Sequence, residues 1–168
     1  MRKALVVLWA AILSLGLFAG AAYAADKIGY LDLSRTFSEY NKTKDYDKVL
    51  GDKENKYTAE RDKKVNDIKQ FQDKLNLLSD KEKESKKGDL ESRLKKLQDY
   101  DREQQTDLRK EQDEKMKEIL KDIEDAVKLY SQKQGFTMVF NDRVLVYQDK
   151  SMDITDKIIS ALNSKYKR

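Results

Sequence analysis

The feature that most constrains this chain is a long polar segment, positions 41–134, with apolar side chains at steps of three and four residues. Such spacing keeps one stripe of a helix facing a partner helix. The chain has no proline, which would remove a backbone donor and clash with the preceding helical turn. Charged residues make up 39% of the 168 residues, too many for a thick globular core. The segment therefore predicts long helices with a narrow apolar seam.

Ser79 and Glu82 divide this segment. Ser79 followed by Glu82 three residues later fits a capping box, which starts a new helix. If the chain folds back there, the two stripes meet at positions whose numbers add to about 158, such as Val65 with Leu94. Gly88 is the alternative turn. The prediction is an antiparallel coiled-coil arm over 41–134 with its tip at about 79–88, each helix roughly 55–60 Å long.

Polar residues interrupt the seam of this arm. Asp101, Gln104 and Glu111 occupy positions where a stable coiled coil has leucine. Helices of this kind gain most of their stability from packing. We therefore expect a weakly packed arm that bends and is anchored at its base.

The hydrophobic period changes to two on either side of the arm. Residues 27–34, 136–140 and 144–147 are predicted strands, with a turn at 141–143. A last helix follows Asp153, with its apolar residues Ile154, Ile158, Ile159 and Leu162 on one side. A two-stranded hairpin alone is marginal, so the first strand is expected to join the other two. The fold class is α+β, mainly α: a long antiparallel coiled-coil hairpin inserted in a small three-stranded β body made of residues 25–40 and 135–168.

This body is too small to bury its apolar faces and strand edges alone. We therefore expect it to form a homo-oligomer. The residues predicted to form its core and subunit interface are Ile28, Tyr30, Leu31, Val139, Phe140, Leu145, Val146 and Tyr147.

The amino terminus differs from the rest of the chain. Arg2 and Lys3 precede an apolar run, and Ala22-Tyr23-Ala24 is a small-x-small cleavage motif. These features predict a signal peptide over residues 1–24, cleaved after Ala24 on export to the periplasm. An uncleaved membrane anchor is the alternative, because the run approaches the roughly 20 residues that span a bilayer.

Composition weighs against several function classes. The chain has no histidine and no cysteine, which argues against catalytic triads, zinc sites and redox pairs. No glycine-rich phosphate loop is present either. We expect no enzyme activity, no metal and no cofactor. Without Arg2 and Lys3 the chain has 33 basic and 31 acidic residues, so the near balance also argues against nucleic-acid binding.

Three parts of the sequence resemble the periplasmic chaperone family called Skp or OmpH-like: Ile28–Asp32, Phe136–Tyr147 and Ser151–Asp156. The resemblance implies a homotrimer with a central β-barrel and three helical arms around a cavity. It also implies an ATP-independent holdase that binds unfolded outer-membrane proteins in this cavity and prevents their aggregation. Family members are often strongly basic, whereas positions 41–134 hold 25 basic and 24 acidic residues. We therefore expect at most weak contact with an anionic membrane surface.

Two groups of arm residues are candidates for client binding. The tip carries a local excess of basic charge, which either attracts acidic clients and phosphate head groups or is simply a solvated helix end. Aromatic residues of the arm either fill its seam or offer apolar contacts to clients. The candidates are Lys81, Lys83, Lys86, Lys87, Arg93, Tyr57, Phe71 and Tyr100.

A second class of function is a coiled-coil structural spacer or adaptor of the cell envelope. A retained anchor and a rigid, leucine-rich seam would favour it. The polar seam favours the chaperone hypothesis instead, because many weak and adaptable contacts suit a binder without sequence specificity.

Overall fold

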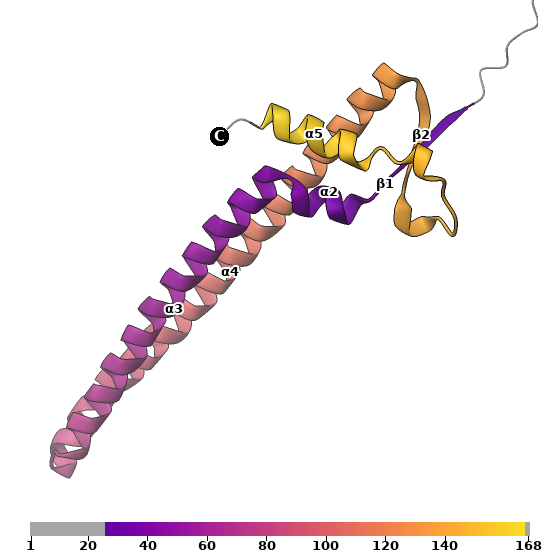
Figure 1. Ribbon diagram of the computed structural model, residues 1–168. Helices are drawn as coiled ribbons and strands as arrows, with labels where there is room; N and C mark the ends of the chain where they lie inside the picture. Colours follow the sequence, from indigo (N-terminus) through magenta and orange to yellow (C-terminus); the bar gives the residue numbers. More distant parts are fainter. Residues whose placement is uncertain (1–25, 167–168) are drawn as a thin grey trace, which may run out of the picture.

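The computed structural model describes residues 26–166, which form a long helical arm attached to a small body (Figure 1). The predicted signal peptide lies outside the described residues. In chain order the elements are β1 (Lys27–Leu31), α2 (Leu33–Glu39), α3 (Asn41–Asn76), α4 (Asp80–Gln134), β2 (Phe136–Asn141), the 3₁₀ turns η2 (Asp142–Val144) and η3 (Lys150–Met152), and α5 (Thr155–Lys165).

Local sequence chemistry sets the ends of the arm. Helix α3 ends at Asn76 and α4 begins at Asp80, which confirms the predicted turn. The Ser79 backbone N–H donates to the Glu82 carboxylate at 3.1 Å, as a capping box requires. Gly88, the alternative turn, lies inside α4. At the other end Gly135 closes α4 with a φ of 74°, a left-handed conformation that favours glycine.

The body contains a two-stranded sheet, in which β1 and β2 run parallel and pair over Ile28–Leu31 and Met138–Asn141. The arm is thus the crossover connection between two parallel strands. Gly29 lies directly beneath the ring of Phe136, where an added Cβ would come within 2.8 Å of a ring carbon. A larger residue at this position would therefore force the Phe136 ring to move.

The prediction of a third strand at 144–147 is wrong for the single subunit. After Asn141 the chain forms η2, because the Asn141 side chain accepts a hydrogen bond from the Arg143 backbone N–H. The outer edge of β1 is already occupied: Ile154 N–H donates to the Tyr30 carbonyl at 3.0 Å, and Asp153 forms a bridge with Tyr30. Residues 144–147 therefore cannot pair with the outer edge of β1.

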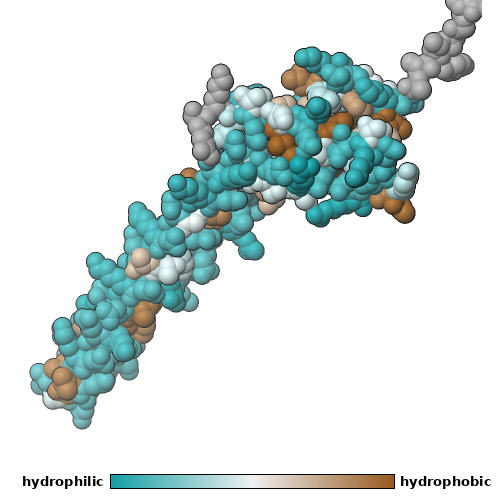
Figure 2. Space-filling view, in the orientation of Figure 1, coloured by the Kyte–Doolittle hydropathy of each residue, from teal (hydrophilic) through white to brown (hydrophobic). Residues whose placement is uncertain are grey.

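The hydrophobic core lies where the arm meets the body. Helix α5 contributes Ile158 and Leu162, both buried, against Ile119 and Ile123 of α4. This confirms the predicted apolar side of the last helix. Thr155 fixes the start of α5 to the sheet, since its hydroxyl accepts a hydrogen bond from the Asp32 backbone N–H at 3.0 Å. Apolar colour in Figure 2 gathers on the body and appears as isolated spots along the arm.

Candidate functional site

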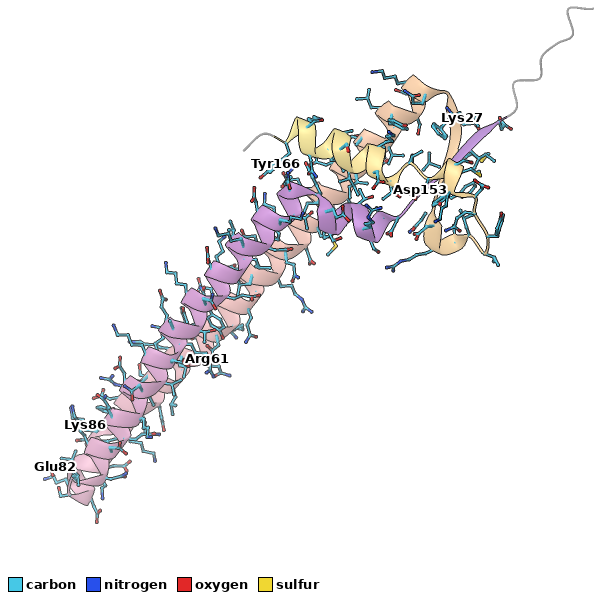
Figure 3. All side chains as sticks on the ribbon, viewed as in Figure 1. Lys27, Arg61, Glu82, Lys86, Asp153 and Tyr166 are labelled. Atoms are coloured by element: carbon cyan, nitrogen blue, oxygen red, sulfur yellow. The ribbon has the colours of Figure 1, made fainter. Side chains whose placement is uncertain are left out.

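The middle of the arm is held by polar contacts between α3 and α4. The Tyr57 hydroxyl donates to Asp101 at 3.1 Å, and the Arg61 guanidinium forms an ion pair with the same carboxylate at 3.2 Å (Figure 3). Positions 57 and 101 match the predicted register. Asp101 therefore occupies a seam position, as the sequence predicts, but its carboxylate is paired.

Two further cross-helix contacts continue this polar layer. Lys53 pairs with Glu111 at 2.6 Å, and the Tyr100 hydroxyl donates to Glu60 at 2.8 Å. Burial, followed by the Glu60 hydrogen bond, raises the pKa of Tyr100 to about 12. The Lys53 side chain is 47% exposed in its pair with Glu111. Such a pair contributes a few tenths of a kcal/mol to about 1 kcal/mol to the stability of the arm. The layer aligns the helices without binding them tightly.

The distal arm has little apolar packing. In α3 the only fully buried apolar residue is Ile68, and in α4 the buried residues are Ile119 and Ile123, both at the base. Phe71 is half-buried and lies under the Arg93 guanidinium, 4.5 Å from its ring centroid. The rings of Tyr57 and Tyr100 contact each other at a tilt of 38°, with centroids 5.9 Å apart. The predicted aromatic candidates thus fill the seam and remain partly accessible.

The base of the arm carries a dense charged cluster that the sequence analysis missed. Lys42 of α3 pairs with Glu118 at 2.6 Å and with Asp122 at 2.7 Å, and Asp122 also accepts from the Tyr40 hydroxyl. Lys115 makes a second contact to Glu118 at 2.7 Å. Glu118 and Asp122 are four residues apart on one face of α4, but only the fold places Lys42 opposite them.

Charge and burial shift the pKa values of this cluster. Burial of the Lys42 ammonium lowers its pKa, but hydrogen bonds to Asp122 and Glu118 outweigh this effect and raise the pKa overall. Hydrogen bonds from Lys115 and Lys42 lower the pKa of Glu118 to about 2. Burial and the neighbouring Asp122 raise the pKa of Tyr40 to about 12. Lys42 and Glu118 are therefore charged, and the Tyr40 hydroxyl is neutral, across neutral pH.

The predicted basic tip lies on the first turns of α4, far from the body (Figure 3). All four tip lysines are exposed. Lys83 lies 3.9 Å from Asp80 and Lys86 lies 3.5 Å from Asp89, whereas Lys81 and Lys87 form no ion pair with the described residues. Arg93 is separate from them, because it is engaged with Phe71.

The residues predicted to form the subunit interface fall into two groups. Tyr30 and Leu31 are buried within the subunit, and Val139 packs against its core. Ile28 and Phe140 are more than a third exposed, and Val146 and Tyr147 are almost wholly so. Leu145 is half-buried. Ile28 and Phe140 lie in the two strands, whereas Val146 and Tyr147 lie after β2, in the segment that forms no strand.

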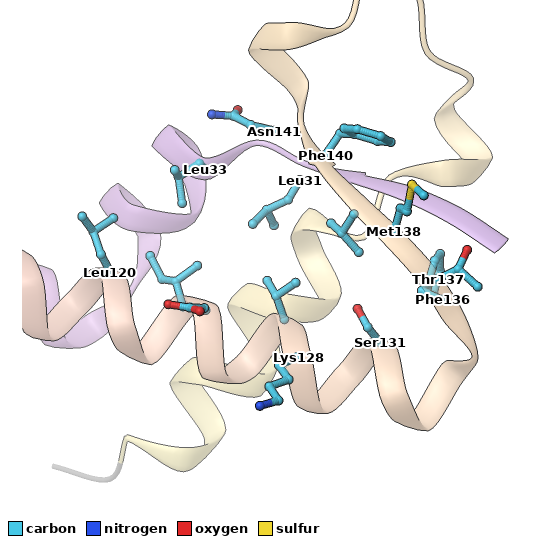
Figure 4. Close-up of a pocket in the computed structure, with 14 residues that line it drawn as sticks. Leu31, Leu33, Leu120, Lys128, Ser131, Phe136, Thr137, Met138, Phe140 and Asn141 are labelled. Atoms are coloured by element: carbon cyan, nitrogen blue, oxygen red, sulfur yellow. The ribbon is translucent and has the colours of Figure 1, made fainter. Parts of the chain in front are cut away.

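An apolar groove of about 520 Å³ lies beside this segment, between α4 and β2 (Figure 4). Its walls include Leu33, Leu120 and Val127 on one side and Met138 and Phe140 on the other. We call it the α4–β2 groove. The sequence analysis identified Val139 and Phe140 on the strand side of this groove but not Leu120 or Val127 of α4.

The described residues offer no site for metal chemistry, since they contain no cluster of three or more His, Cys, Asp or Glu side chains. Within residues 26–166, no helix is long and apolar enough to cross a membrane. The described residues thus form a charged helical arm with a polar seam, which projects from a small body with exposed apolar residues.

Comparison with known proteins identifies the family. A sequence model of the OmpH-like outer membrane protein family matches residues 27–162. The chaperone protein Skp of Yersinia enterocolitica is 30% identical over 156 residues, which cover 90% of this chain and 95% of the relative. Skp of Vibrio cholerae is 30% identical over 159 residues, covering 90% and 92%. The chain belongs to the OmpH-like family, which includes these Skp chaperones.

A solved structure supports the fold. The crystal structure of an OmpH-like outer membrane chaperone from Caulobacter crescentus superposes with a TM-score of 0.78 and covers 85% of this chain and 87% of its own. The two sequences are only 14% identical over this match, so the similarity concerns the fold alone.

Proposed function

We propose that this chain is an ATP-independent periplasmic holdase, which binds unfolded outer-membrane proteins in a cavity between helical arms and prevents their aggregation. The observation that carries the proposal is the sparse packing of the arm, where Ile68 is the only fully buried apolar residue of α3. Half-buried aromatic residues and charges of both signs offer many weak contacts, which suit clients that share no sequence. The membership of the OmpH-like family, with its Skp chaperones, supports the same function.

The cavity requires more than one arm, and we propose a homotrimer held through the body. The exposed Val146 and Tyr147, the outer edge of β2 and the α4–β2 groove support this assembly. Unpaired strand edges and apolar patches of this kind favour self-association. In such an assembly residues 144–147 gain a neighbouring strand from another subunit, and the three-stranded body and central barrel become possible.

Sedimentation of a double variant, Val146→Asp with Tyr147→Asp, tests the assembly. Both side chains are exposed in the subunit, so the variant keeps its fold and its far-UV circular dichroism. We expect it to sediment as a monomer and to lose most of its ability to suppress aggregation. A trimer with full activity would contradict the proposed interface. A double variant at an exposed site of the arm, Val49→Asp with Lys48→Asp, is the control and should stay trimeric.

A spacer or adaptor function has less support. A rigid spacer needs a continuous apolar seam, whereas the described arm has paired polar side chains at Asp101 and Glu111. The basic tip remains a candidate for client capture and for weak contact with an anionic surface, and its unpaired Lys81 and Lys87 are the side chains to test.

A further inference from the structure

A second groove lies on the opposite flank of α4, between this helix and α5. Its apolar lining comprises Ala126, Leu129 and Tyr130 of α4, Ala161 and Leu162 of α5, and the rings of Tyr40 and Tyr166. Its volume is about 420 Å³, within the range of ligand-binding sites in proteins. We call it the α4–α5 groove. It shares no lining residue with the α4–β2 groove.

Leu129 gives this groove an exposed apolar wall. Its side chain is 69% exposed, although the neighbouring Tyr130 packs against the core. The two tyrosines behind it are fixed, since the rings of Tyr40 and Tyr166 meet edge to face with centroids 5.7 Å apart. The groove is thus a formed apolar surface rather than a gap that side chains would close.

The acidic residues at the rim of the groove have partners, whereas two of its lysines have none among the described residues. The two acidic rim residues are already neutralised, Asp122 by Lys42 at 2.7 Å and Asp125 by Lys121 at 3.1 Å. Lys133 and Lys165 also line the groove, and neither side chain has an ion pair or a hydrogen bond within residues 26–166. The net character offered to a ligand is an apolar floor beside two unpaired positive charges.

These dimensions limit the occupant to a short amphipathic segment. Asp122 and Lys133 are eleven residues apart on α4, about 16 Å at 1.5 Å per residue. An extended peptide of about five residues spans this distance at roughly 3.3 Å per residue. A long acyl chain would place apolar carbons against the charged residues at either end of the groove. A peptide with one large apolar side chain between two carboxylates fits better, because the side chain covers the apolar floor and the carboxylates pair with the lysines.

We propose that the α4–α5 groove binds an extended polypeptide segment in which a large apolar side chain lies next to acidic residues. The inference rests on the proposed function, because unfolded clients supply such segments. It adds a site at the base of the arm, on the body, that selects segments by charge. The arms would then hold the rest of the client through contacts of low specificity.

Three blocked pentapeptides test the proposal with the full-length oligomer: Ser-Asp-Phe-Glu-Ser, Ser-Lys-Phe-Lys-Ser and Ser-Asp-Ser-Glu-Ser. Methyl NMR of leucine and alanine groups reports both affinity and location. We expect the first peptide to shift the signals of Leu129, Ala126 and Ala161. The second peptide should bind at least about fivefold more weakly, because it places two positive charges against Lys133 and Lys165. The third should also bind at least about fivefold more weakly, because it lacks the apolar side chain that would cover the floor of the groove.

Matched variants locate the charge and the apolar contact. Lys133→Glu combined with Lys165→Glu should weaken binding of the acidic peptide about fivefold or more. Lys63→Glu combined with Lys69→Glu, at exposed positions of α3 on the arm, should leave it unchanged. Leu129→Ser should weaken binding, whereas Leu77→Ser at the tip should not. Equal binding of acidic and basic peptides, or shifts confined to other residues, would overturn the proposal.

The outcome is separable from that of the proposed function. Suppression of aggregation of an unfolded β-barrel protein is measured independently with the wild type. Loss of peptide binding with retained suppression overturns the groove alone. Absence of suppression by the wild type overturns the holdase function, while specific binding of the acidic peptide would still support the groove.

Discussion

Lys42 anchors the arm, and its replacement by methionine tests how the base is held. Methionine keeps an unbranched side chain of similar length and removes only the ammonium. The change breaks the contacts to Glu118 and Asp122, which join the start of α3 to α4. Each acid retains one other partner, Lys115 for Glu118 and Tyr40 for Asp122. The variant therefore removes two ion pairs without leaving an unpaired buried charge.

The expected cost follows from burial. The Lys42 side chain is 22% exposed and its partners are 43% and 31% exposed. Breaking a fully buried pair costs about 3–5 kcal/mol, and an exposed pair contributes about 0–1 kcal/mol. For this intermediate site we expect Lys42→Met to lower the free energy of unfolding by about 1–2 kcal/mol. Lys121→Met, which removes the exposed pair with Asp125, should cost much less than Lys42→Met.

Urea unfolding followed by circular dichroism, at fixed protein concentration, measures both variants. The pKa of Glu118 is lowered to about 2, so its stabilisation is present above the pKa of about 4.3 in the unfolded chain and is lost as pH falls toward 2. The stability difference between wild type and Lys42→Met should therefore be constant from about pH 6 to 9 and shrink below about pH 4. Equal stabilities of the two methionine variants, or a difference unaffected by acid, would refute this account of the base.

Three other predictions concern the arm and its ends. Ile68→Ala should destabilise the arm by about 2–4 kcal/mol and make it sensitive to protease, because the Ile68 side chain is buried. The Val65 side chain is partly exposed, so Val65→Ala should cost less than about 1 kcal/mol. Similar costs for the two variants would show that Ile68 does not hold the distal seam. Gly135→Ala should destabilise by about 1 kcal/mol or more because its φ is 74°, whereas Gly51→Ala, in an open helical position, should stabilise by about 0.5–1 kcal/mol; changes of the same sign would contradict the backbone argument. Lys81→Glu with Lys87→Glu should slow client association at low salt and lose this effect at high salt, as stopped-flow fluorescence would show, and unchanged association rates would assign the tip lysines to solvation alone.

Local chemistry made much of this fold predictable. Ser79 with Glu82, and Gly135, mark helix ends through contacts within a few residues, so the sequence is sufficient to place them. The apolar spacing of Ile158 and Leu162 likewise predicted a buried face for α5. Such signals depend on neighbours along the chain and not on the rest of the fold.

Features that depend on distant partners were not predictable in the same way. Residues 144–147 form an apolar run typical of a strand, but in the subunit they lie in and after η2 and pair with neither β1 nor β2. Lys42 looks like any surface lysine until the fold places it against Glu118 and Asp122. The α4–α5 groove escaped notice for the same reason, because Leu129 and Lys165 come together only when α5 packs on α4. The sequence therefore predicts that the candidate site is a helical arm, but it does not predict the side-chain contacts within that site.

Mass measurement of the mature protein, alone and with an unfolded outer-membrane β-barrel protein, tests the central claim most directly. The full chain has a mass of 19.7 kDa, and cleavage of the predicted signal peptide would make the mature subunit smaller. The account predicts a particle of three subunits that gains the mass of one client and keeps that client out of aggregates without ATP. A particle that stays monomeric, or a trimer whose mass does not change while the client aggregates, would contradict it.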